Sequence, residues 1–444
     1  MRASNPLDAW TAARIGGAGS TVARTDLLSY QMRQLRETVA WAKQRSPFYR
    51  HQLGTFDETS LATPDDLRRL PYTTADDLRR NDPPLLCVSQ SEISHVVTLD
   101  TSGTSGTPKR LFFTADEQEA TLDFFDHGMR LPARAGDRVL ILFPGARSGS
   151  VGNLLAAALQ RMGATAIPAG WLQDPAATAA LLRRERPDVV AGAPVPMLAV
   201  ARHTAAMGLP PLRVRSVLLS SDHAAASLRH SLANLWGCEI FEHYGMTEMA
   251  LGGGVDCDAH AGYHMRESEL LIEVVDPANG EPVADGESGE VVFSTLARRG
   301  MPLIRYRSGD LSRVLPDACA CGSPLRRLDR IQRRATGAIP LGGEVGLTMA
   351  ALDEALFALD DIADFSATFR PGSPPTLHLE VTRVGRDPER EAPLLAAVRA
   401  ALETIPAIAA ACATQGLRLA AALAHRRELL QRVGKRTITV AVQP

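Results

Sequence analysis

The chain has 444 residues, a formal net charge of −2, 45% hydrophobic residues and 22% charged residues. These values are typical of folded globular proteins, and the near-neutral charge offers no electrostatic basis for binding nucleic acid or an anionic membrane. The length predicts two or three domains. The six cysteines are too few and too unevenly spaced for a disulfide framework. The sequence has no apolar leader segment and no apolar run of membrane-spanning length, so we expect a cytoplasmic protein.

The first half of the chain predicts helices followed by an α/β region. Helical periodicity runs over 26–53, and two short capped helices follow at 62–70 and 74–80. From about 95 to 245, strand candidates alternate with helix candidates, which predicts a sheet flanked by helices. The strand candidates are 139–143, 164–168, 189–191, 216–220 and 239–244, and the helix candidates are 149–162, 175–185, 194–207 and 224–236.

The second half of the chain changes character. Over 269–315, short apolar runs are separated by turn residues, which predicts a β-rich subdomain. After about 335 a smaller α+β module follows, with helices near 348–359 and 391–403 and strands near 376–382 and 436–442. The predicted fold class is therefore α/β, with a large part built from several subdomains and a small C-terminal α+β part.

A loop rich in hydroxyl groups carries the clearest chemical signal. It consists of Thr101, Ser102, Gly103, Thr104, Ser105, Gly106, Thr107, Pro108 and Lys109. The two glycines lack Cβ atoms, so backbone N–H groups can approach phosphate oxygens closely, and the lysine supplies positive charge. The spacing differs from the P-loop of nucleoside triphosphatases, because Thr-Pro separates Gly106 from Lys109 and Arg110 stands where Ser or Thr is required.

Lysine is rare in this chain, which makes its placement informative. Only Lys43, Lys109 and Lys435 occur among 48 basic residues. Arginine serves nearly every other cationic role, so a lysine in a phosphate loop suggests that a compact ammonium group is needed there. Lys435, near the C-terminus, invites the same interpretation, whereas Lys43 lies in a helical segment and is expected to be a solvated side chain.

Two further motifs complete a recognisable set, Glu242-His-Tyr-Gly-Met-Thr-Glu248 and Tyr306-Arg-Ser-Gly-Asp310-Leu. Together with the loop 101–109, in this order, they resemble the core motifs of the acyl-adenylate-forming superfamily of acyl-coenzyme A synthetases, adenylation domains and luciferases. The segments Ser46-Pro-Phe-Tyr, Leu70-Pro-Tyr-Thr-Thr-Ala-Asp-Asp-Leu, Met301-Pro-Leu-Ile-Arg-Tyr-Arg and Cys319-Ala-Cys-Gly are similar to the phenylacetate-coenzyme A ligase branch. The resemblance covers roughly 25–335 well and the remainder weakly.

This resemblance implies roles for the motif residues. The loop residues Thr101–Thr107 and Lys109 would embrace the β- and γ-phosphates of ATP, Glu248 would help to hold Mg²⁺, and Thr247 would contact the α-phosphate. Tyr244 would stack on adenine, and Asp310 would accept hydrogen bonds from the ribose hydroxyls. Lys435 corresponds to the lysine that acts during adenylation, so it is the predicted catalytic residue together with Thr247 and Glu248. The remaining residues assigned to cofactor binding are Ser221, Asp222, His243, Gly245 and Arg334.

Four further residues form a candidate zinc site. Cys257, His264, Cys319 and Cys321 supply three sulfur ligands and one nitrogen ligand, a donor set suited to structural Zn²⁺, and this branch of the family often carries such a site. From the sequence, His260 competes with His264 as the ligand, and reduced cysteines without metal remain an alternative.

The resemblance implies an adenylating domain over 1–334 and a small mobile domain over 335–444, with Thr336 where the family has a hinge Asp. The implied reaction is ATP-dependent adenylation of a small carboxylic acid, expected to be aromatic, followed by acyl transfer to coenzyme A. Transfer to an amine or to a carrier-protein thiol is an alternative, as is a nucleotide-binding accessory protein without turnover. A homodimer and a carrier-protein partner stay open, and the identity of the acid cannot be read from the sequence.

Overall fold

The structure is a computed structural model that describes residues 5–17, 19, 22–99, 107–172, 174–331, 333–334, 337–341, 346–385, 387–424 and 435–441. The chain divides into two compact units, each built from separate segments. Unit 1 comprises 1–134, 147–163 and 242–331, and unit 2 comprises 135–146, 164–241 and 332–444. Each unit has its own cluster of buried apolar side chains, so each has its own hydrophobic core.

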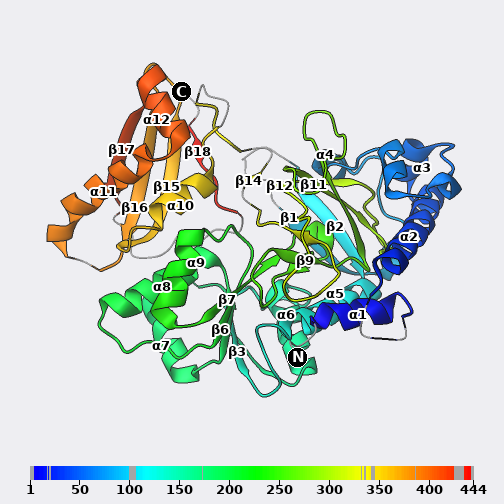
Figure 1. The fold of residues 1–444 in the computed structure, drawn as a ribbon, viewed down its shortest axis with the longest axis horizontal. Helices are drawn as coiled ribbons and strands as arrows, with labels where there is room; N and C mark the ends of the chain where they lie inside the picture. Colours follow the sequence, from blue (N-terminus) through cyan, green and yellow to red (C-terminus); the bar gives the residue numbers. More distant parts are fainter. Residues whose placement is uncertain are drawn as a thin grey trace. The chain divides into compact units, whose positions relative to one another are not determined.

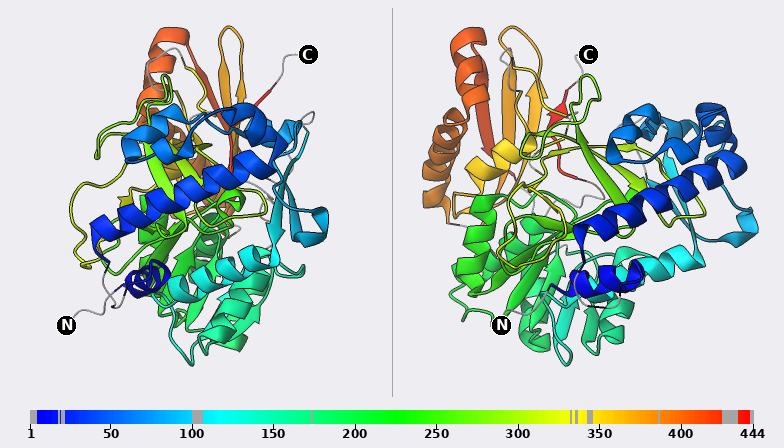
Figure 2. Two further views of the ribbon diagram at one scale, coloured as in Figure 1. Left: turned by 90° about the vertical axis from the view of Figure 1, so that its right-hand side faces the viewer. Right: turned by 45° about the vertical axis from the view of Figure 1, so that its right-hand side comes forward.

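Unit 1 begins with helices. They are α1 (Pro6–Arg14), α2 (Arg24–Arg45), α3 (Pro47–Leu53), α4 (Ala75–Arg80), α5 (Ala115–Met129) and α6 (Val151–Arg161), with 3₁₀ turns η1 (Glu58–Ser60), η2 (Pro64–Arg69) and η3 (Gln90–Glu92) (Figures 1 and 2). The helical segment predicted over 26–53, with its end placed at 46–49, is two helices. It breaks at Ser46, whose hydroxyl accepts a hydrogen bond from the backbone N–H of Tyr49, and Pro47 occupies the first helical position of α3.

The strands of unit 1 form antiparallel sheets. A hairpin pairs β1 (Ile93–Leu99) with β2 (Lys109–Thr114), and Leu99 lies opposite Lys109. A second sheet contains β10 (Leu270–Val275), β11 (Gly289–Thr295) and β12 (Tyr306–Ser312), the predicted β-rich stretch. The third set is β7 (Glu239–Tyr244), β8 (Gly254–Val255), β9 (Tyr263–Met265) and β13 (Arg327–Leu328), with the 3₁₀ turn η4 (Thr247–Met249) directly after β7. The chain passes from unit 2 into unit 1 within β7.

The first part of unit 2 is a parallel sheet. Its strands are β3 (Arg138–Ile141), β4 (Thr165–Pro168), β5 (Val189–Gly192) and β6 (Ser216–Leu219), in the order β4-β3-β5-β6. All residues of β5 and β6 are buried, as expected for parallel strands covered on both faces. The helices that follow β4, β5 and β6 are α7 (Pro175–Glu185), α8 (Pro194–Ala206) and α9 (Ala226–Trp236) (Figure 1).

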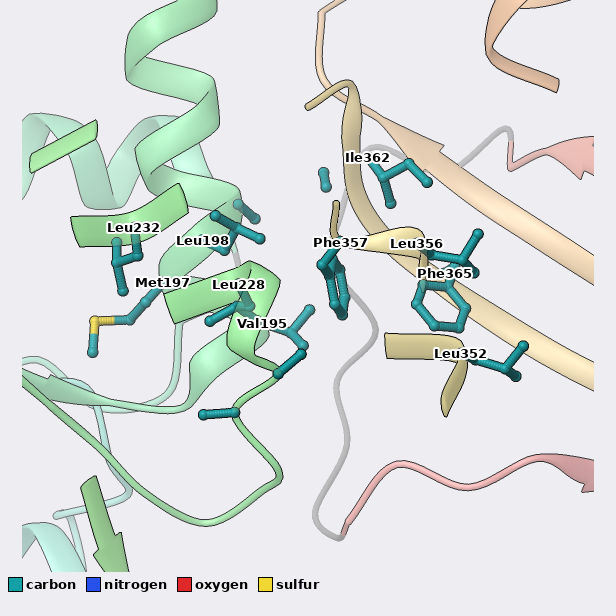
Figure 3. Packing of buried hydrophobic residues seen from close by; sticks show 14 of the residues in the cluster. Val195, Met197, Leu198, Leu228, Leu232, Leu352, Leu356, Phe357, Ile362 and Phe365 are labelled. Carbon is teal, nitrogen blue, oxygen red and sulfur yellow. The ribbon is translucent and has the colours of Figure 1, made fainter. Parts of the chain in front are cut away.

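The C-terminal part of unit 2 contains a second sheet of mixed direction. Its strands are β15 (Ile362–Arg370), β16 (Thr376–Arg383), β17 (Arg418–Leu423) and β18 (Thr439–Val440), in the order β17-β16-β15-β18. It is accompanied by α10 (Met349–Leu356), η5 (Pro388–Arg390), α11 (Glu391–Glu403) and α12 (Pro406–Gln415), and the two-residue strand β14 (Arg333–Arg334) precedes it. In Figure 3, side chains of α8 and α9 lie opposite side chains of α10 and β15.

The predicted α/β fold class is confirmed, since several sheets are flanked by helices. The predicted domain boundary at 334/335 stays a prediction. Among the described residues no single helix is both long and apolar enough to cross a membrane. By length and composition alone, one pair bent by 88°, Pro388–Glu403 with Pro406–Gln415, meets that requirement when its two helices are taken together.

Candidate active site

The turn after β7 fixes the position of a buried acid in unit 1. Strand β7 ends at Tyr244, and η4 then carries Thr247 and Glu248. The turn closes through Ala250 and Leu251, whose φ angles of 54° and 67° lie in the left-handed region. Such conformations cost roughly 1–3 kcal/mol each and are found where the surrounding structure fixes them, often at functional sites. Only 3% of the Glu248 side chain is exposed.

The Glu248 carboxylate is the point where the three predicted motifs meet. Lys109, the first residue of β2, places Nζ 2.5 Å from Glu248 Oε1. The Tyr306 hydroxyl, from the third motif, donates to the same oxygen at 3.1 Å. Arg298 donates to the backbone carbonyl of Glu248 at 3.0 Å, which holds the turn itself. If the ammonium group moves to an anionic ligand, the buried carboxylate is left able to bind a hard cation.

The two residues predicted to bind the nucleoside are also in contact. The Tyr244 hydroxyl donates to Asp310 Oδ2 at 3.2 Å, and both side chains are buried. Asp310 follows Gly309, whose φ of +74° turns the backbone so that the Gly309 N–H donates to Glu290 at 3.0 Å. The Tyr263 ring packs 5.8 Å from the Tyr244 ring, between centroids. A phenol aligned by a buried carboxylate offers a flat surface and an acceptor, the two features that a nucleoside needs.

His243 and Gly245 flank Tyr244 and lie in tight surroundings. The His243 ring lies 6.3 Å from Phe124 and 6.2 Å from Phe125, the latter edge to face, both on α5. Burial, with a smaller contribution from the nearby Arg266 guanidinium, lowers the pKa of His243 to about 4, so its imidazole is neutral at pH 7. At Gly245 an added Cβ would lie 2.4 Å from the carbonyl oxygen of Leu251, so the turn has room only for glycine.

The four predicted zinc ligands lie together in unit 1. The ligand atoms of Cys257, His264, Cys319 and Cys321 lie within 4.8 Å of one another. The Cys257 and Cys319 sulfur atoms are 3.6 Å apart, and Cys321 Sγ is 3.3 Å from His264 Nε2. Sulfur atoms bound to one zinc ion in a tetrahedral shell would be about 3.8 Å apart.

The two candidate histidine ligands differ in their surroundings. His264 Nδ1 lies 3.3 Å from the Leu325 carbonyl, an arrangement that directs Nε2 toward the cysteines. His260 Nδ1 instead lies 3.0 Å from Asp256 Oδ2, so His260 is part of a different pair. The donor set formed with His264 therefore fits zinc.

Four predicted site residues belong to unit 2. Ser221 and Asp222 form the turn after β6, where Ser221 has a φ of 80°. Arg334 lies in β14 with an exposed side chain, and Lys435 precedes β18. The backbone N–H of the next residue, Arg436, donates to Asp222 Oδ2 at 3.2 Å, which brings two of the predicted segments together.

Part of the predicted phosphate loop, Thr101–Gly106, lies outside the described residues, as does the predicted hinge residue Thr336. Thr107, the last hydroxyl residue of the loop, is described and exposed, and it precedes β2. Sequence reasoning assigned no role to Tyr306, Arg298 or Arg436. Tyr306 begins a motif that was recognised, so its contact with the second motif could have been suspected, whereas no local pattern marks the other two.

Comparison with known proteins decides the family. Residues 55–297, more than half of the chain, match the family described as AMP-binding enzyme. The chain belongs to this family. The AMP-binding chain is also 29% identical over 356 residues to phenylacetate-coenzyme A ligase of Thermus thermophilus, with 77% of this chain and 78% of that one covered. It is 28% identical over 406 residues to phenylacetate-coenzyme A ligase of Aromatoleum evansii, with coverage of 87% and 89%.

A solved structure shows the same fold. The 2-hydroxyisobutyryl-coenzyme A ligase in its postadenylation state, in complex with 2-HIB-AMP, matches this AMP-binding enzyme with a TM-score of 0.77. The match covers 94% of this chain and 89% of that one at 22% identity. The resemblance to the acyl-adenylate-forming superfamily, on its phenylacetate-coenzyme A ligase-like branch, is confirmed.

Proposed function

We propose that this AMP-binding enzyme activates an aromatic carboxylic acid with ATP, releases pyrophosphate, and transfers the acyl group to coenzyme A. The enzyme class is confirmed, because the chain belongs to the AMP-binding family and its relatives are named as coenzyme A ligases: it is an ATP-dependent carboxylate-coenzyme A ligase. The aromatic acid, the release of pyrophosphate and the residue roles are the proposal. The observation that carries it is the convergence of Lys109 and Tyr306 on the buried Glu248.

The proposed chemistry has two steps. A carboxylate oxygen attacks the α-phosphorus of ATP, pyrophosphate leaves, and an acyl-adenylate forms. The thiol sulfur of coenzyme A then attacks the acyl carbonyl carbon, AMP leaves, and the thiol proton passes to solvent. The first step brings two anions together, so the protein must supply positive charge and hold both reactants in line.

The residues of unit 1 fit the first step. Lys109 can exchange Glu248 for phosphate oxygens, since a lysine ammonium is a mobile point charge with three donors. Glu248 would then be available to hold Mg²⁺, and the ion would supply positive charge to the phosphate oxygens. Tyr306 continues to orient the Glu248 carboxylate through its hydroxyl. We propose that Tyr244 stacks on adenine and that Asp310 accepts the ribose hydroxyls.

Two observations support an aromatic acid. The rings of Phe124 and Phe125 on α5 lie beside His243, next to Tyr244, and the imidazole of His243 is itself neutral. The relatives from Thermus thermophilus and Aromatoleum evansii are named for phenylacetate, an arylacetic acid.

We also propose that Cys257, His264, Cys319 and Cys321 bind one structural zinc ion. Burial raises the pKa of the Cys257 and Cys321 thiols, so these cysteines stay protonated unless a cation takes the place of the protons. Four protein ligands complete a tetrahedral shell, so such a zinc would stabilise the fold around β9 and leave no open position for a substrate. The cytoplasmic location stays a prediction.

The test is a screen of carboxylic acids for pyrophosphate release, with and without coenzyme A. We expect arylacetic and related aromatic acids to give pyrophosphate with ATP and Mg²⁺ alone, and a thioester with AMP once coenzyme A is added. Thioester formation detected by mass spectrometry separates coenzyme A from an amine or a carrier-protein thiol as acceptor. The absence of acid-dependent pyrophosphate release across the panel would refute adenylation.

A further inference from the structure

The residue after the predicted catalytic lysine is buried between two acids of unit 2. Arg436 is 9% exposed, and its guanidinium donates to Asp353 of α10 and, at 3.4 Å, to Asp364 of β15. It also donates to the Phe365 carbonyl at 2.9 Å. Asp353 and Asp364 are 2% and 4% exposed, so all three ionisable side chains lie inside the protein.

Two aromatic rings pack against the Arg436 guanidinium. The Arg436 guanidinium carbon lies 4.3 Å from the ring centroid of Phe365 and 5.2 Å from that of Phe357. Burying ions is costly even when they are paired, and a hydrophobic set of similar size is often at least as stable, so stability alone does not explain the cluster. What a buried guanidinium held by two acids and a carbonyl oxygen provides is a fixed position, because its planar fork accepts few alternative geometries.

The main chain of Arg436 is held as well. Its N–H donates to Asp222 Oδ2 at 3.2 Å, so the peptide group that joins Lys435 to Arg436 is tied to the turn after β6. The side chain therefore fixes this segment to α10 and β15, and the main chain fixes it to the Ser221-Asp222 turn. The Cα atom of Lys435 is one residue away from both attachments.

Helix α10 and strand β15, which hold the Arg436 side chain, are in turn bound to α8 and α9. Arg202 of α8, 3% exposed, donates to the carbonyl oxygens of Phe357, Leu359 and Ile362 at 2.6–2.8 Å. Glu354 of α10 accepts from the backbone N–H groups of Ala226 and Ser227 at the start of α9. Figure 3 shows the apolar side chains between these contacts, namely Val195, Leu198 and Leu228 opposite Leu356, Phe357 and Ile362.

We propose that Arg436 is a positioning residue that holds Lys435 for the adenylation step. The inference rests on the proposed function, because it takes Lys435 as the residue that stabilises charge during adenylation. Lys435 has a long flexible side chain, and fixing its backbone leaves only the side-chain torsions to be ordered. A displacement of about 1 Å in such a group can lower a rate by roughly 10²-fold. Loss of the anchor should slow acyl-adenylate formation and spare thiol attack on an acyl-adenylate that is already formed.

The experiment measures the two half-reactions separately in the full chain. Arg436→Met, Arg436→Lys and Lys435→Ala are compared with wild type by single-turnover pyrophosphate release, using the best acid from the screen, and by thioester formation from that acid's adenylate supplied with coenzyme A. We expect Arg436→Met to lower the first rate about 10²-fold and to change the second by less than about twofold. Arg418→Met is the matched control, since this exposed arginine lies on β17 in the same sheet, and both rates should be unchanged.

Arg436→Lys keeps a buried cation beside the two acids, so it serves if Arg436→Met does not fold. A lysine lacks the planar fork with which Arg436 reaches both acids and the Phe365 carbonyl. The rate of adenylation should therefore fall about tenfold, while thioester formation persists. In the Lys435→Ala background, Arg436→Lys should add no further loss, because the group it positions is already gone. Unchanged adenylation, equal loss of both half-reactions, or effects that multiply in the double variant would overturn the proposal. A wild-type protein that releases no pyrophosphate with any acid would instead refute the proposed function.

Discussion

The neutral imidazole of His243 should make the protein sensitive to acid. An exposed histidine has a pKa near 6.5, and burial beside Arg266 lowers that of His243 to about 4. The folded protein therefore binds fewer protons here than the unfolded chain, so stability falls as the pH drops from about 6.5 toward 4. The difference between the pKa of His243 in the unfolded and folded states corresponds to about 3 kcal/mol of the free energy of unfolding. About 2 kcal/mol of it should be lost between pH 7 and pH 5.

The perturbation is His243→Gln, which keeps a polar side chain of similar reach and removes the titration. Urea unfolding at pH 7 and pH 5 should show that the variant loses about 2 kcal/mol less stability on acidification than wild type does. His51→Gln is the control, because His51 is exposed on α3, and its substitution should leave the pH dependence as in wild type. An NMR titration that places the His243 pKa near 6.5, or equal pH dependence in wild type and His243→Gln, would refute the reasoning.

Tyr306→Phe removes a hydrogen bond to the charged Glu248, so urea unfolding should show a folding stability lower by about 1.5–3 kcal/mol. Acid-dependent pyrophosphate release should slow as well, because the Glu248 carboxylate loses the hydroxyl that orients it, and an unchanged rate would exclude Tyr306 from the site. Metal analysis of freshly purified protein should find about one zinc per chain. Cys321→Ser should lose metal and Tm together, and His260→Ala should retain the metal; metal-free wild type would contradict the zinc assignment. Gly245→Ala should weaken ATP binding in calorimetry, because its Cβ would lie 2.4 Å from a backbone carbonyl oxygen, and wild-type affinity would show that the turn adapts.

Much of the secondary structure could be predicted because it follows from local patterns. The helix predicted over 175–185 and the strand over 239–244 have the same bounds in the structure. Helix α5 was expected after residue 120 without bounds, and the capping box of Thr114 and Glu117 marks its start in the sequence.

The candidate site was predictable as a set of residues and less so as a set of contacts. Three motifs identified Lys109, Glu248 and Asp310, but no spacing in the sequence indicates that Lys109 and Tyr306 contact the same carboxylate oxygen. The burial of Arg436 depends on how α10 and β15 pack, and nothing in the neighbouring residues Gly-Lys-Arg-Thr indicates it.

The interleaving of the two units has a consequence for how the protein is made. Unit 1 includes residues 1–134, yet its β10–β12 sheet and Glu248 on η4 come from the segment 242–331. A ribosome adds about 5–20 residues per second, so the helices of 1–134 wait roughly 10–40 s for the remainder of their core. During that time the apolar side chains of α2 and β2 that pack against 242–331 are exposed, and an expression strain with limited chaperone capacity should lose this protein to aggregation before it can fold.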